Sequence, residues 1–149
     1  MSDLKDRVAM VTGAGRGIGR AIVRVLAEKG MRVGLNDMDF ALAETATKEL
    51  CAEGLQVLAL PGDVSRRAEV SDMMDRVELE LGPLWLLVNN AGILNTAPVT
   101  EFTEEAWDKA FEVDAKGVFL CSQAAIRKMI PRHRGRIVNI ASIAGIIVR

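Results

Sequence analysis

Short apolar, β-branched runs alternate with helical stretches along the whole chain, and this alternation constrains the fold more than any other feature of the sequence. Strands that alternate with helices in this way predict a parallel sheet with right-handed crossovers, which is a doubly wound α/β fold. No repeat, low-complexity tract or linker-like break interrupts the pattern, so we expect a single domain over residues 1–149. The expected strands are 8–12, 32–36, 56–60, 84–88 and 136–140. The expected helices run from Ile18 to Gly30, from Phe40 to Ala52, from Ser65 to Leu81 and from Thr103 to about Met129, with a kink near Gly117.

Composition excludes several classes of function. Lys and Arg number 19 against 20 Asp and Glu, and the signs are interspersed, so no nucleic-acid surface is expected. The single histidine, His133, excludes a His-rich metal centre, and we expect no metal. The chain has no tyrosine, so it cannot by itself complete a mechanism that needs a tyrosine acid or base. Cys51 and Cys121 lie far apart in apolar helical stretches, which predicts buried thiols in a reducing compartment.

The apolar runs are too short to span a bilayer, and the N-terminus carries no apolar segment of the kind found in a secretory signal. We therefore expect a cytoplasmic protein without a membrane partner.

A glycine-rich turn joins the first strand to the first helix, with the sequence Thr12-Gly13-Ala14-Gly15-Arg16-Gly17-Ile18-Gly19. In a doubly wound sheet, ligands bind outside the carboxyl ends of the strands. Glycines there let the backbone approach a pyrophosphate, whose charge the amide groups of the helix N-terminus bind. An ordinary strand-to-helix turn is the alternative. Neither the Gly-x-Gly-x-x-Gly spacing nor the Gly-Lys pair of phosphate-binding loops is present.

Acidic residues follow the next two strands. Asp37 can accept both ribose hydroxyls of an adenosine and repel a 2′-phosphate, whereas Arg16 could pair with that phosphate. We weigh the carboxylate more heavily and expect NAD as the cofactor rather than NADP. Asp63 and Val64 suit the edge and face of an adenine ring. Solvated loop acids, and in the case of Asp63 a turn acid before a helix cap at Ser65, are the alternatives.

The fourth strand ends in Asn89-Asn90-Ala91-Gly92, two amides and two small residues that form a hydrogen-bonding corner with room for a ligand. Together with the glycine-rich turn and the two acids, this corner resembles the short-chain dehydrogenase/reductase family, in the variant with three residues between the first two motif glycines. The segment Gly135-Arg136-Ile137-Val138-Asn139-Ile140-Ala141-Ser142 resembles that family's fifth strand and the start of its active site. The resemblance covers essentially the whole chain.

The resemblance implies a Rossmann-like sheet in the order 3-2-1-4-5 and NAD(P)-dependent hydride transfer between a small-molecule alcohol or carbonyl substrate and the nicotinamide. It implies roles for individual residues: Gly13, Gly17, Ile18 and Gly19 at the pyrophosphate, Asp37 at the ribose, Asp63 and Val64 at the adenine, Asn90, Ala91 and Gly92 along the inner edge of the cofactor, and Ser142 at the substrate carbonyl.

Two departures from the family pattern bear on catalysis. Asp114 stands where the family usually has an asparagine that supports a proton relay, and an ionised carboxylate can only accept hydrogen bonds. The family's Tyr-x-x-x-Lys pair follows the serine by about a dozen residues, with the lysine lowering the tyrosine pKa. Seven residues follow Ser142 here, none of them tyrosine or lysine. We therefore expect the cofactor-binding portion of a longer dehydrogenase.

Two other functions remain open at this point. One is an NAD-binding module without catalysis. The other is a methyltransferase that uses S-adenosylmethionine, although Val11 stands where that class usually has an acid. In the expected strand order the fifth strand is an apolar edge, which predicts pairing with another copy and hence a homo-oligomer.

Overall fold

The computed structural model describes residues 4–142, and its centre is a parallel sheet of five strands. The strand order β3-β2-β1-β4-β5 confirms the predicted topology. The strands are β1 (Val8–Val11), β2 (Arg32–Asp37), β3 (Val57–Pro61), β4 (Leu84–Asn89) and β5 (Arg136–Asn139). β3 is displaced by one residue from its expected position, since Pro61 pairs in register with Asp37. Proline is tolerated there because β3 is an edge strand in this sheet.

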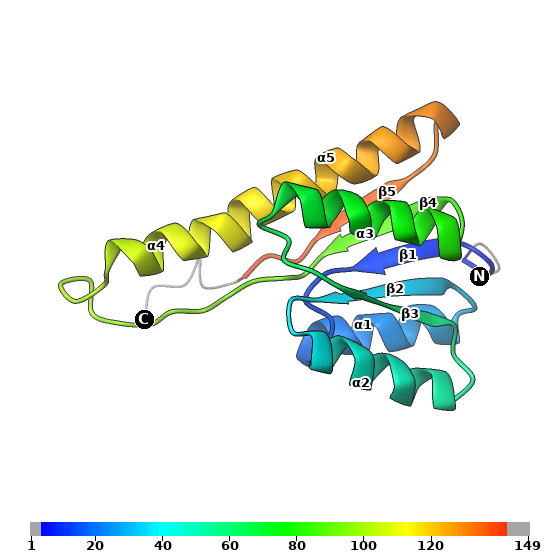
Figure 1. Ribbon diagram of the computed structural model, residues 1–149, viewed down its shortest axis with the longest axis horizontal. Helices are drawn as coiled ribbons and strands as arrows, with labels where there is room; N and C mark the ends of the chain where they lie inside the picture. Colours follow the sequence, from blue (N-terminus) through cyan, green and yellow to red (C-terminus); the bar gives the residue numbers. More distant parts are fainter. Residues whose placement is uncertain (1–3, 143–149) are drawn as a thin grey trace.

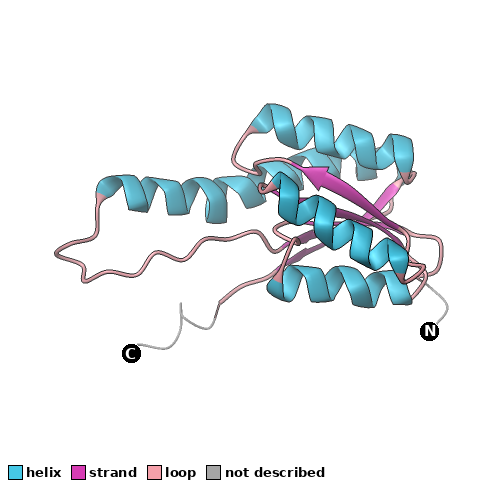
Figure 2. Ribbon diagram, turned by 60° about the horizontal axis from the view of Figure 1, so that its bottom comes forward, coloured by secondary structure: helices cyan, strands magenta, loops and turns pink. Residues whose placement is uncertain are grey.

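Helices cover both faces of the sheet (Figure 1). They are α1 (Gly17–Glu28), α2 (Phe40–Ala52), α3 (Arg67–Glu80), α4 (Glu104–Phe111) and α5 (Val118–Met129), with a short 3-10 turn at Ile130–Arg132. α1 and α2 lie on one side, while α3 and α5 lie on the other. Figure 2 shows α4 and the loop before it projecting beyond the end of the sheet. Across residues 4–142 no helix has the length and apolar character needed to cross a membrane.

Two apolar clusters, one on each face, hold the layers together. All four residues of β1 are buried, and they alternate between the clusters: Val8 and Met10 join the side of α3 and α5, while Ala9 and Val11 join the side of α1 and α2. Successive side chains of a strand point to opposite faces, so a central strand covered on both sides must be apolar throughout. This explains why the sequence shows continuous apolar runs.

Capping agrees with the sequence at one helix and departs from it at another. The Thr103 hydroxyl accepts a hydrogen bond from Ala106 N (3.2 Å) at the start of α4, as predicted. The prediction that Ser65 caps α3 is wrong, because its hydroxyl donates to Asp63 Oδ1 (2.7 Å) and the helix begins at Arg67. A hydrogen bond from a hydroxyl to an ionised carboxylate is stronger than one from a backbone amide to a hydroxyl. The Ser65 hydroxyl therefore donates to Asp63 rather than capping the helix.

The long helix expected over residues 103–129 is interrupted by a π-helical segment, Glu112–Gly117, which agrees with the expected kink near Gly117. Gly117 packs directly on Val64, because a Cβ at this glycine would lie 2.8 Å from Val64 Cγ2. The widened turn brings the helix onto the turn that follows β3, where a side chain would block the approach. π-helical turns of this kind often occur at functional sites.

The two cysteines differ in environment. Cys121 is fully buried in α5, and burial raises the pKa of its thiol to about 12. The expectation that Cys51 is also buried is wrong: it lies on the exposed side of the last turn of α2, and its thiol donates to Val57 O. An apolar neighbourhood in sequence did not distinguish the two faces of α2.

Candidate functional site

A cavity of about 690 Å³ opens at the carboxyl ends of the strands. Its lining includes ten of the predicted cofactor-binding residues: Gly13, Arg16, Ile18, Gly19, Asp37, Asp63, Val64, Asn90, Ala91 and Gly92. Gly17 lies between Arg16 and Ile18 with a φ of +58° and is not part of the lining. The lining also includes seven residues that the sequence analysis did not single out: Asn36, Met38, Asp39, Leu42, Gly62, Ile93 and Val113. Segments far apart in the sequence therefore meet in one hollow.

Two glycines of the first turn are required by contacts within the protein, independently of any ligand. A Cβ at Gly13 would lie 2.6 Å from Ala91 Cα, and the φ of Gly13 is +59°. A Cβ at Gly19 would lie 2.5 Å from both Asn90 Nδ2 and Gly13 O. Real side chains do not make contacts this short, so the corner after β4 could not seat against the turn if either glycine carried a side chain.

Thr12 fastens this corner, a role that the sequence analysis missed. Its Oγ1 accepts hydrogen bonds from Asn90 N (3.0 Å) and Ala91 N (3.0 Å) and donates to Val88 O (3.4 Å). In the opposite direction, the side-chain Nδ2 of Asn90 donates to Thr12 O and Gly13 O, both at 2.9 Å. Asn90, which was predicted to lie along the cofactor, therefore uses its side-chain NH2 group to bind the glycine-rich turn.

A buried asparagine joins the turn to β3. Asn36 Nδ2 donates to Leu60 O (2.9 Å) and Gly62 O (2.8 Å), and Oδ1 accepts from Gly13 N (3.4 Å). A fully buried amide must satisfy its donors and acceptors internally. The signal in the sequence was a polar residue within an apolar strand, directly before Asp37.

Asp37 is held at the rim of the cavity by two backbone amides. Its Oδ2 accepts from Gly15 N (3.0 Å) and its Oδ1 accepts from Asp39 N (3.0 Å). A Cβ at Gly15 would lie 2.9 Å from Asp37 Oδ2, so this glycine lets the carboxylate reach the turn. Asp39 also lines the cavity, while Arg16 supplies a positive charge. Carboxylates thus outnumber cations at this end.

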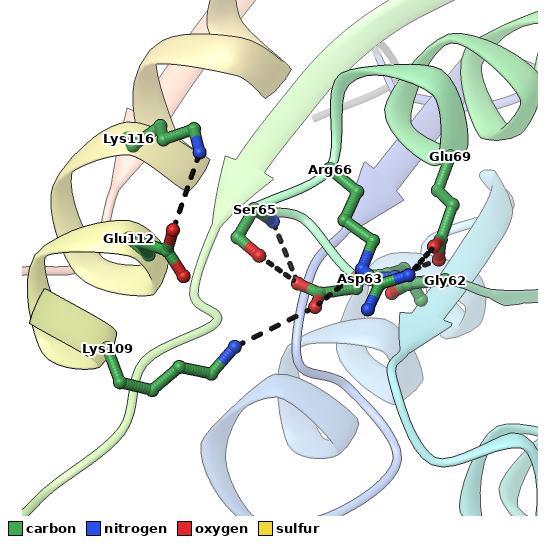
Figure 3. A network of polar contacts seen from close by, with 9 residues as sticks. Gly62, Asp63, Ser65, Arg66, Glu69, Lys109, Glu112 and Lys116 are labelled. Carbon is green, nitrogen blue, oxygen red and sulfur yellow. Dashed lines mark hydrogen bonds and ion pairs between the residues drawn. The ribbon is translucent and has the colours of Figure 1, made fainter. Parts of the chain in front are cut away.

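Asp63 is the other predicted acid of the site (Figure 3). Ser65 donates to its Oδ1 from both N (2.9 Å) and Oγ (2.7 Å), while Arg66 and Lys109 form ion pairs with Oδ2. Partial burial by itself raises the pKa of Asp63, but the hydrogen bonds from Ser65 and the charges of Lys109 and Arg66 outweigh it and lower the pKa below its ordinary value. The carboxylate is therefore ionised at neutral pH.

The two predicted catalytic residues lie outside the cavity lining. Asp114 is exposed on the π-helical segment, and its Oδ1 accepts from Ile93 N (2.9 Å), so it holds the loop that follows β4. Ser142 is exposed at the end of the described chain, two residues beyond Ile140, whose N donates to Asn89 O (2.9 Å). Within residues 4–142 no cluster of three His, Cys, Asp or Glu side chains could hold a metal.

Comparisons with known proteins agree with this architecture. The family model described as short chain dehydrogenase matches residues 7–148. The chain is 37% identical over 139 residues to 5-keto-D-gluconate 5-reductase of Escherichia coli (strain K12), covering 93% of this chain and 55% of that protein. It is 40% identical over 141 residues to gluconate 5-dehydrogenase of Gluconobacter oxydans (strain 621H), covering 95% and 55%. The chain thus spans about half the length of these relatives.

Solved structures show the same fold. A short-chain type dehydrogenase/reductase from Mycobacterium marinum superposes with a TM-score of 0.94 at 30% identity, covering 99% of this chain and 60% of the other. A gluconate 5-dehydrogenase from Burkholderia cenocepacia J2315, in complex with NADP and tartrate, gives a TM-score of 0.91 at 37% identity, with coverage of 99% and 58%. Because the family model, the relatives and the folds coincide over nearly all of its residues, the chain belongs to the short-chain dehydrogenase family.

Proposed function

We propose that the protein is an NAD-dependent oxidoreductase and that this chain supplies its dinucleotide site. The observation that carries the proposal is the cavity at the carboxyl ends of the strands, which gathers the glycine-rich turn, both acids and the corner after β4. The reaction is hydride transfer between nicotinamide and a small-molecule alcohol or carbonyl. Family membership gives the methyltransferase alternative no support.

The N-terminus of α1 suits the pyrophosphate. Arg16 is its N-cap residue and makes no side-chain capping hydrogen bond, so the first amides of the helix keep their donors for a ligand. These amides carry the positive end of the helix dipole, and the glycines beside them let two phosphates come close. Ile18 and Gly19 both line the cavity at this point.

The acids support NAD rather than NADP. The carboxylate of Asp37 can accept hydrogen bonds from the ribose hydroxyls, while a 2′-phosphate would bring like charges together. Asp39 adds a second negative charge at the same end of the cavity, and Arg16 offsets it only in part. The Burkholderia relative was solved with NADP, so the preference calls for a direct measurement.

The proposed catalytic residues of this chain are Ser142, which follows β5, and Asp114 on the π-helical segment. Ser142 would polarise the substrate carbonyl, and Asp114 would take part in the proton relay. When bound, the nicotinamide would accept the hydride from an alcohol or donate it to a carbonyl. Homo-oligomerisation stays a prediction, supported by the exposed apolar residues Val138 and Ile140 at the β5 edge.

Nucleotide titration tests the proposal. We expect the purified protein to bind NADH more tightly than NADPH, as followed by nucleotide fluorescence. Asp37→Ser should reduce or reverse this preference, with a change of about tenfold in the ratio of the two Kd values, because one charge beside the phosphate is lost. The matched variant Glu44→Gln removes a carboxylate from α2, outside the cavity lining, and should leave the ratio unchanged.

A protein that binds neither nucleotide would refute the proposal. Binding without oxidation of any alcohol, in a panel that includes gluconate, would instead favour the module without catalysis. Gluconate belongs in the panel because two of the relatives are named for it or its keto form.

A further inference from the structure

The two oxygens of Asp63 have different surroundings. Oδ1 accepts two hydrogen bonds from Ser65, at 2.9 Å from N and 2.7 Å from Oγ. Oδ2 faces Arg66 Nε at 3.6 Å and Lys109 Nζ at 3.9 Å, and both distances exceed that of a hydrogen bond. Among residues 4–142 no donor is hydrogen-bonded to Oδ2, so it is an open acceptor in a residue that lines the cavity.

The two cations beside Oδ2 are not equivalent. Arg66 belongs to the same turn as Asp63 and also pairs with Glu69, at 3.5 Å. Lys109 reaches the turn from α4, as Figure 3 shows, and Asp63 is its ion-pair partner in the described part of the chain. A lysine ammonium has three donor hydrogens on a flexible stem, so Lys109 can turn toward a ligand without leaving Asp63.

Contacts other than the ion pair fix the helix that carries Lys109. Val113, one turn further along, is buried and lines the cavity. Gly117 packs against Val64, which adjoins Asp63 in the same turn. The ammonium of Lys109 and Oδ2 of Asp63 are therefore placed side by side by the packing of the helix on this turn. Together they present a donor next to an acceptor.

We propose that Lys109, acting with Asp63, contacts the base of the bound cofactor and limits how strongly the site prefers adenine over hypoxanthine; the inference rests on the proposed dinucleotide site. The edge of adenine presents an amino donor beside a ring-nitrogen acceptor. Oδ2 accepts from the amino group, and Lys109 donates to the ring nitrogen. Hypoxanthine carries an oxygen in place of the amino group, so Oδ2 then faces another acceptor, and Lys109 supplies the donor that offsets the repulsion.

A pair of lysine variants tests this reading. Lys116 lies on the adjoining π-helical segment, is exposed to a similar extent (52% against 46%) and pairs with Glu112 at 3.7 Å. Lys109→Met and Lys116→Met each remove one charge and keep most of the apolar stem. Each protein is titrated with NADH and with reduced nicotinamide hypoxanthine dinucleotide, following nucleotide fluorescence.

We expect Lys109→Met to weaken NADH binding about threefold and binding of the hypoxanthine nucleotide about tenfold. Lys116→Met should change either Kd by less than about twofold. Equal effects of the two variants on both nucleotides would overturn the inference while leaving the dinucleotide site intact. A wild-type protein that binds neither nucleotide would refute the proposed function, and this inference with it.

Discussion

Thr12→Val tests the hydrogen bonds that fasten the corner after β4. The substitution preserves shape and β-branching but removes the acceptor of Asn90 N and Ala91 N. An amide left without a partner costs about 1–3 kcal/mol when it is buried. These two amides lie in a partly buried corner that water can reach in part, so we expect unfolding to become easier by about 3 kcal/mol. That is a large share of the roughly 5–15 kcal/mol typical of a domain.

Thr47 provides a matched control within the same chain. It is also a buried threonine, at 9% exposure in α2, but its Oγ1 has no hydrogen-bond partner in the structure of residues 4–142. Thr47→Val therefore removes a buried hydroxyl that makes no compensating bond, at no cost in helix propensity. We expect a stability equal to that of the wild type or higher by about 1 kcal/mol.

Urea unfolding followed by the fluorescence of Trp85 and Trp107 measures both changes. With a slope of about 2 kcal/mol per molar, Thr12→Val should lower the midpoint by about 1.5 M. NADH affinity should fall with it, because the corner lines the cavity. Equal midpoints for Thr12→Val and Thr47→Val would refute the reasoning, because the loss of stability would then not depend on the hydrogen bonds that the hydroxyl makes.

Three further predictions concern thiols, acid and a glycine. Cys51 should react with a thiol reagent at pH 8 in the folded protein, whereas Cys121, whose pKa is raised to about 12, should react only after unfolding; equal rates would contradict the assigned burial. Because the pKa of Asp63 is lowered in the folded chain, its carboxylate stabilises the fold above its ordinary pKa of 3.8, and this contribution is lost as pH falls through the folded value. The difference in unfolding free energy between wild type and Asp63→Asn should therefore shrink in acid, and a constant difference down to pH 2 would show that the charge is immaterial. Gly19→Ala should abolish NADH binding and lower the unfolding midpoint, because its Cβ would meet Asn90 Nδ2 at 2.5 Å; unchanged affinity would mean that the corner can shift.

The strand order was implied by the family resemblance. The sequence pattern itself predicted the parallel sheet and most element bounds, because those depend on periodicity and on the apolar runs that a doubly covered sheet requires. It also predicted most of the residues that meet in the cavity, since the carboxyl ends of parallel strands lie at one edge. What it could not predict was the direction in which each polar side chain points. Asn90 lines the cavity, but nothing in the sequence indicated that its side chain would donate to Thr12 O and Gly13 O. Ser65 was expected to cap a helix and instead donates to Asp63.

Long-range pairs were also beyond the sequence. In the sequence, α3 and β4 lie between Lys109 and Asp63, and nothing local to either residue indicates the other. The exposed position of Cys51 depends on how α2 is rotated against the sheet, which an apolar stretch without clear amphipathicity leaves open. These features depend on packing between elements rather than on patterns within one.

The π-helical segment Glu112–Gly117 fixes the rotational phase between the two halves of the long helix. Each residue of an α-helix turns the chain by about 100°, so deleting one residue here would rotate α4 by that angle while α5 kept its seat on β4 and α3. Asp114 would turn away from Ile93, and Lys109 would turn away from Asp63. The length of this segment, more than its composition, therefore decides which side chains α4 presents to the nucleotide end of the sheet.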